Sequence, residues 1–67
     1  MAVARVTEIT SSSPKSFDDA MRLGIERATE TLQNVTGAWL KDQEVVVDGG
    51  KITDYRVRLK ITFILNK

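Results

Sequence analysis

The last third of the chain, KITDYRVRLKITFIL (residues 51–65), alternates between apolar and polar side chains from Tyr55 to Phe63. Successive side chains of a β-strand point to opposite faces of a sheet, so this period of two indicates a strand with one face on a core. The apolar face carries Tyr55, Val57, Leu59, Ile61, Phe63 and Leu65, and the other face carries Arg56, Arg58, Lys60 and Thr62. The chain is therefore expected to build a sheet that is apolar on one face and strongly basic on the other.

A helix long enough to cover the apolar face is predicted from Ser16 to near Asn34. Ser16 in SFDD is a suitable N-cap, with Asp19 three residues on, and the two aspartates of the first turn suit the positive end of the helix dipole. Gly24 lies on the apolar stripe, which favours a close approach to a strand. The stripe recurs at three- and four-residue steps and comprises Phe17, Ala20, Met21, Gly24, Ile25, Ala28 and Leu32.

Two further strands are predicted. VARVTEI (3–9) is rich in β-branched residues, and VTGAWLKDQEVVV (35–47) is joined to the last strand by DGG (48–50), whose glycines suit a hairpin turn. TSSSPKS (10–16), with five hydroxyls and the only proline, is predicted to be a loop between the first strand and the helix.

These elements predict an α+β fold with β-α-β-β order, in which one amphipathic helix packs on a three-stranded antiparallel sheet of order 1-3-2. All 67 residues form one domain (1–67) in this interpretation. So short a chain buries little surface, and without cysteine it has no disulfide to compensate. The half-covered sheet and its two free edges therefore indicate self-association.

Several function classes are not expected. The chain has no cysteine or histidine, so the common nucleophile and base pairs of enzymes, and the usual zinc ligands, are missing. The net charge of +1 is too balanced to suggest nucleic-acid binding. No apolar run is long enough for a membrane span or a signal peptide, so the protein is interpreted as cytoplasmic.

The candidate binding residues lie on the second and third predicted strands. Trp39, the only tryptophan, is interpreted either as a core or intersubunit contact or as a platform for a flat ligand. Arg56, Arg58 and Lys60 form either an ion-paired surface or a site for phosphate or carboxylate groups. Asp42 and Glu44 are expected to pair with these cations across the hairpin.

Three stretches together resemble the dodecin family: EITSSSPKSFDDA (8–20) before and into the helix, IERATETLQNV (25–35) at its end, and VRLKITFIL (57–65) in the last strand. The resemblance spans nearly the whole chain. It implies a hollow homododecamer of β-α-β-β protomers, and many members hold flavins in pairs at subunit interfaces. The implied function is non-enzymatic binding and storage of a flavin such as FMN or riboflavin, with the chain itself as partner.

The resemblance also places the site. The tryptophan that stacks on the flavin ring in flavin-binding members falls on Gly37, and Trp39 lies two residues later on the same strand face. The family's ring-binding glutamine falls on Arg56, which donates hydrogen bonds but cannot accept them. Asp42 matches an acidic position near the ribityl chain. Trp39, Arg56, Asp42 and Gly37 are accordingly the predicted flavin-binding residues, and no catalytic residue is predicted.

The alternative is a dodecin-like shell that binds no flavin and has a structural or calcium-binding role. A subgroup without the stacking tryptophan, which includes calcium-associated members, also carries arginine at the position of Arg56. A calcium site would need several oxygens converging from different subunits, so its ligands are not identified from the sequence.

Overall fold

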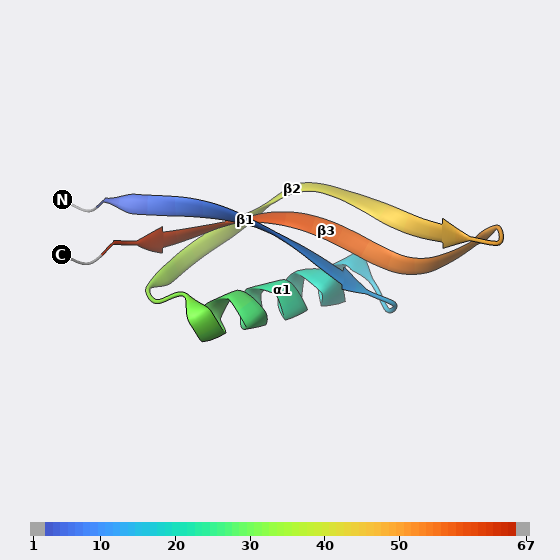
Figure 1. Cartoon of the computed structure of the whole chain (residues 1–67), viewed down its shortest axis with the longest axis horizontal. Helices are drawn as coiled ribbons and strands as arrows, with labels where there is room; N and C mark the ends of the chain where they lie inside the picture. Colours follow the sequence, from blue (N-terminus) through green and yellow to red (C-terminus); the bar gives the residue numbers. More distant parts are fainter. Residues whose placement is uncertain (1–2, 66–67) are drawn as a thin grey trace.

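The computed structural model describes residues 3–65. It contains β1 (Ala4–Ser13), α1 (Phe17–Thr31), β2 (Val35–Asp48) and β3 (Lys51–Ile64). The strands form one antiparallel sheet of order β1-β3-β2. The helix lies along one face of this sheet (Figure 1). The predicted α+β fold, β-α-β-β order and central last strand are therefore confirmed.

The first strand is longer than predicted. The prediction of a loop over residues 10–16 is wrong for residues 10–13, which belong to the strand. β1 continues to Ser13, which pairs with Tyr55 of β3. Ser13 is fully buried, and its Oγ donates a hydrogen bond of 2.6 Å to Asp19 Oδ2 while accepting one of 3.0 Å from the Lys15 N–H. Hydroxyl-rich composition indicated a loop, but here small hydroxyl side chains fill the narrow space between strand and helix.

The helix begins as predicted and ends earlier. The Ser16 Oγ accepts a 3.0 Å hydrogen bond from the Asp19 N–H, which caps the first turn. Hydrogen bonds from the Ser13 hydroxyl and then from Arg22 lower the pKa of the Asp19 carboxyl below its ordinary value. The helix stops at Thr31 rather than near Asn34, because Leu32 is already extended and Asn34 adopts a positive φ of 63° that turns the chain into β2.

The core lies between α1 and the middle of the sheet. Val57, Leu59 and Ile61 of β3 are fully buried against Ala20 and Ala28 of the helix. Small helix residues at this contact let the helix axis approach the sheet closely. A Cβ on Gly24 would lie 3.0 Å from the Ser11 Cβ and 3.1 Å from the Leu59 Cδ1, so the close approach predicted for this glycine is confirmed.

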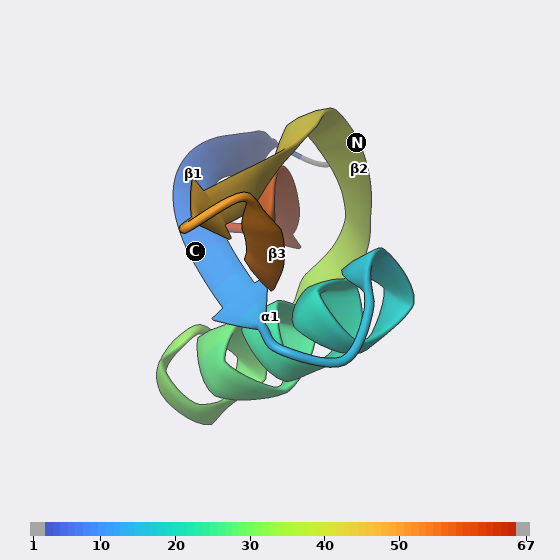
Figure 2. The same cartoon turned by 90° about the vertical axis from the view of Figure 1, so that its right-hand side faces the viewer.

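The sheet is longer than the helix that covers it. The molecule measures 50 × 19 × 13 Å, and the β2–β3 hairpin extends well past the start of α1 (Figure 1). Gly49 and Gly50, with φ of 60° and 79°, form its turn. Seen from the hairpin end, the strands arch over the helix, which lies on one side only (Figure 2). Within residues 3–65 no helix is both long enough and apolar enough to cross a membrane.

Candidate functional site

The face of the sheet that points away from α1 carries the candidate site, and it is called the open face below. Side chains directly opposite each other on antiparallel strands share a face. Because Val57, Leu59 and Ile61 face the helix, the residues between them on β3 belong to the open face. Across from them on β2 are Gly37 opposite Thr62, Trp39 opposite Lys60, Asp42 opposite Arg58, and Glu44 opposite Arg56.

A β-bulge brings Trp39 and Asp42 to the same face. Simple alternation would put residues 39 and 42 on opposite faces of the sheet. The register shifts between Leu40 and Asp42, so that Lys41 is an extra residue in β2 and the alternation changes phase. The Lys41 Nζ reaches Glu8 of β1 at 3.3 Å, which places this side chain over the open face as well. No feature of the sequence indicated this bulge.

Trp39 is not part of the protomer core. Its side chain is 50% exposed on β2, opposite Lys60. The interpretation of Trp39 as a core residue of its own protomer is therefore wrong, whereas a contact between copies and a ligand platform both remain compatible with the position. An indole that is half exposed on a sheet face presents a flat apolar surface to whatever packs there.

Ion pairs occupy much of the open face beside Trp39. Arg58 donates to Asp42 and Glu44, at 2.9 Å each, and these hydrogen bonds, that to Asp42 foremost, raise the pKa of Arg58. Arg56 lies 3.6 Å from Glu44 and donates a long 3.5 Å hydrogen bond to Ser12. The predicted pairing of Asp42 and Glu44 with the basic side chains is confirmed. Arg58 thus holds both carboxylates in place along the strand.

The four predicted site residues all lie on the open face. Gly37, Trp39 and Asp42 follow one another along β2, and Arg56 lies on β3 beyond Asp42. Trp39 is opposite Lys60, four residues from Arg56, which is a separation of about 13 Å at 3.3 Å per residue. Within one protomer, a ring stacked on Trp39 is consequently closer to Lys60 and Arg58 than to Arg56.

Besides the bulge, sequence reasoning missed one contact on this face. Lys41 and Glu8, which join the two outer strands across β3, were not proposed as neighbours, because they are 33 residues apart and no local pattern links them. Among residues 3–65, no group of three or more acidic side chains is positioned to hold a metal ion within a single protomer.

Comparison with known proteins decides the family. The family model described as Dodecin matches residues 3–66. This chain belongs to the dodecin family. Among curated relatives, the calcium dodecin of Mycobacterium tuberculosis is 34% identical over 64 residues, which are 94% of this dodecin and 89% of the relative.

Solved dodecins have the same fold. The dodecin from Streptomyces davaonensis is 33% identical, with a TM-score of 0.93 over 98% of this chain and 97% of that one. The crystal structure of the Mycobacterium tuberculosis calcium dodecin, described as having a novel calcium-binding site, is 31% identical, with a TM-score of 0.84 over 96% of this chain and 91% of that one. The resemblance found in the sequence is thereby confirmed, and the Streptomyces dodecin and the Mycobacterium calcium dodecin are about equally identical in sequence to this dodecin.

Proposed function

We propose that this dodecin is a non-enzymatic binding protein that assembles as a homododecamer and sequesters a flavin against the open face of its sheet. The observation that carries the proposal is the half-exposed Trp39, a flat apolar ring set among charged groups on that face. A tricyclic ring system stacks well on an indole, and the surrounding charges suit the polar edge and chain of a flavin.

Assembly of copies supports this proposal, because one protomer leaves the open face bare. A site that holds a flat ligand needs a second wall to exclude water, and the protomer provides only one. A second copy of the chain is the simplest source of that wall. In this arrangement Trp39 would stack on the flavin ring, and Asp42 would accept hydrogen bonds from the ribityl hydroxyls. Arg56 lies about 13 Å from Trp39 along the sheet, so it would contact either the far end of the same flavin or a flavin that is bound between this protomer and a neighbouring one.

Replacement of the tryptophan tests the flavin site directly. Stacking of a base on an aromatic side chain contributes about 1–3 kcal/mol, and 1.4 kcal/mol is a tenfold change in affinity. Trp39→Ala is therefore expected to weaken FMN or riboflavin binding on the order of 5- to 100-fold, and Trp39→Phe to weaken it less. The measurement is quenching of flavin fluorescence during titration with assembled protein.

Leu40→Ala is the matched control, because Leu40 is the next residue of β2, points to the helix side opposite Leu59, and is partly exposed. It should leave flavin affinity unchanged. Absence of quenching by the wild-type protein at micromolar concentration counts against flavin binding. Equal affinity for wild type and Trp39→Ala, at unchanged assembly mass, would show that the flavin binds elsewhere.

A second candidate function is calcium binding, favoured by the 34% identity to calcium dodecin and by the adjacent carboxylates Asp42 and Glu44. Both are already held by Arg58. A calcium ion, which takes six to eight oxygens, would have to displace this guanidinium and recruit carboxylates or carbonyls from neighbouring copies. This second function therefore also depends on assembly.

The calcium role predicts that millimolar Ca²⁺ raises the melting temperature of the wild-type assembly, since a ligand that binds only the folded state stabilises it. The double variant Asp42→Asn/Glu44→Gln should lose this increase. Asp18→Asn/Glu30→Gln, which changes two carboxylates on α1, should retain it. A melting temperature that does not respond to Ca²⁺ in the wild type, together with no heat in calorimetry, excludes the role.

A further inference from the structure

A row of three side chains crosses the open face at the level of Trp39. Lys60 of the central strand lies directly opposite Trp39 of β2 and, on its other side, directly opposite Glu8 of β1. Side chains that face each other across antiparallel strands have Cβ atoms about 4.5–5.5 Å apart. The edge of a flat ring stacked on the half-exposed indole would therefore lie within reach of the Lys60 ammonium group.

The other cations around the indole are held by carboxylates. Arg58 contacts two carboxylates at 2.9 Å each, and Arg56 lies 3.6 Å from one of them. The Lys41 Nζ lies 3.3 Å from Glu8, the β1 neighbour of Lys60, so the charge of Glu8 is already compensated. Lys60 itself makes no ion pair with any residue between positions 3 and 65.

The charges on this part of the open face do not balance. From Trp39 to Glu44 on β2, and at the partner positions on β1 and β3, the cations are Lys41, Arg56, Arg58 and Lys60, and the carboxylates are Glu8, Asp42 and Glu44. One positive charge is therefore left over, and the pairing assigns it to Lys60. This side chain is partly buried on the middle strand, with a neighbouring strand on each side, which restricts where its ammonium group can lie.

We infer that Lys60 recognises the polar edge of the flavin ring by donating a hydrogen bond from its ammonium group to a ring carbonyl oxygen. This role rests on the proposed flavin site at Trp39 and adds the group that orients the ring there. Arg56, about 13 Å from Trp39 along the sheet, is the more distant donor within the same protomer.

The chemistry of an ammonium group gives this site a definite selectivity. The polar edge of a flavin ring carries an N–H, at N3, between two carbonyl groups. A side-chain amide can donate to a carbonyl and also accept from that N–H, whereas an ammonium group has three donors and no acceptor. Methylation of N3 therefore removes no hydrogen bond to Lys60. The favoured ligands are flat rings whose edge is rich in acceptors or negatively charged.

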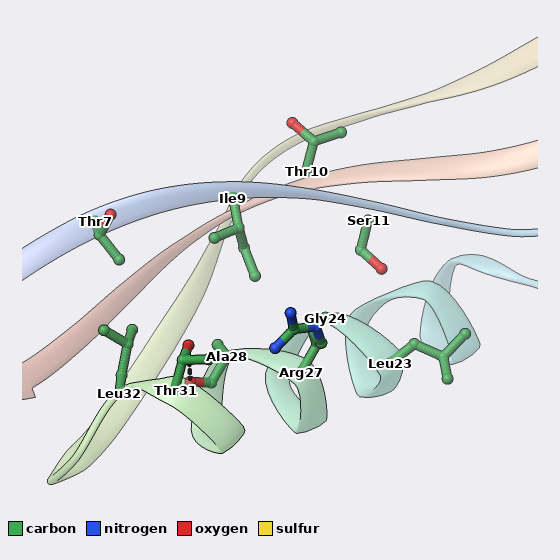
Figure 3. A pocket seen from close by; sticks show the side chains of 10 residues that line it. All are labelled: Thr7, Ile9, Thr10, Ser11, Leu23, Gly24, Arg27, Ala28, Thr31 and Leu32. Atoms are coloured by element: carbon green, nitrogen blue, oxygen red, sulfur yellow. Dashed lines mark hydrogen bonds between the residues drawn. The ribbon is translucent and has the colours of Figure 1, made fainter.

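The groove between β1 and α1 supplies a matched control, because it is a second hollow that also carries a cation. Its volume is about 660 Å³, and its lining includes Ile9, Leu32 and Arg27 (Figure 3). It lies on the helix side of the sheet, so the sheet separates it from Trp39 and Lys60. Replacing Arg27 removes one positive charge beside a hollow without changing the open face.

Titration of riboflavin with the assembled full-length protein, followed by quenching of flavin fluorescence, tests the role of Lys60. Lys60→Met keeps an unbranched side chain but removes the ammonium group, and it should weaken riboflavin binding about tenfold, the effect of losing one hydrogen bond from a charged group. Lys60→Arg keeps a charged donor and should retain most of the affinity. Arg27→Met should bind riboflavin as the wild type does.

A second measurement compares riboflavin with 3-methylriboflavin, which differ only at the ring edge. The wild-type protein should bind both with similar affinity, because Lys60 has no acceptor for the N–H that methylation removes. A loss of about tenfold or more on methylation would show that this N–H has an acceptor in the site, and it would overturn the assignment of Lys60 to the ring edge.

The native mass and circular dichroism of each variant are measured first, so that altered binding is not confused with altered folding. Absence of quenching by the wild type would overturn the proposed flavin function and the role of Lys60 with it. Weaker binding by Trp39→Ala, with unchanged binding by Lys60→Met, would overturn only the role of Lys60. Equal weakening by Lys60→Met and Arg27→Met would overturn it as well, because it would reveal a general effect of net charge.

Discussion

Leu59→Ala is expected to lower the free energy of unfolding by about 2–5 kcal/mol, the usual range for truncating a buried leucine. Leu59 is fully buried at the centre of β3, between Val57 and Ile61, and its Cδ1 borders the place where α1 comes closest to the sheet. Removing it leaves a cavity that neither the central strand nor the closely packed helix can move to fill. The effect is measured by urea unfolding at a fixed protomer concentration, since association contributes to stability.

Leu40→Ala is the internal comparison, because Leu40 is the cross-strand neighbour of Leu59 on β2 and undergoes the same chemical change. Leu40 is 37% exposed, so its truncation removes less buried surface and creates no enclosed cavity. Its loss of stability should be clearly smaller. Equal losses for the two variants would mean that the core is not centred on Leu59.

Gly24→Val is expected to destabilise the protein by about 1–3 kcal/mol, the typical effect of adding bulk to a well-packed core. Valine has a better helix propensity than glycine, so an exposed helix position would gain slightly from this change. Here the new Cβ alone would lie 3.0 Å from the Ser11 Cβ, and the valine methyl groups would be nearer still to β1 or to Leu59. The helix would have to move away from the sheet. Thermal or urea unfolding measures the result.

The matched control for this steric effect is Gly37→Val, the same substitution in β2. A Cβ at Gly37 has no atom within 4 Å, and valine is favoured in strands. Its stability should be unchanged or slightly higher. A Gly24→Val variant at least as stable as wild type would falsify the close helix–sheet contact.

Some elements were predictable because their information is local. The alternation around Leu59 defines a half-buried strand by itself, and the two glycines after Asp48 supply the positive φ values of the hairpin turn. Ser16 caps the helix as predicted, since its partner Asp19 is only three residues away. The pairing of Asp42 and Glu44 with arginines follows from the hairpin, which brings those positions together.

Other elements required contacts between distant parts of the chain. Residues 10–13 have loop composition, but pairing with β3 and burial against α1 make them strand, with Ser13 bonded to Asp19. The bulge at Lys41, which gives Trp39 and Asp42 a common face, follows no local rule and depends on register against β3. That register also separates Trp39 from Arg56 by about 13 Å, which no linear spacing reveals.

The sequence by itself determined the element order, the central strand and the family, because side-chain period, caps and turns act between residues that are close along the chain. The tertiary structure alone decided which side chains share the open face and how far the hairpin passes the helix. These depend on strand register and on where α1 meets the sheet, and a shift of one residue in register reverses the face of every side chain that follows.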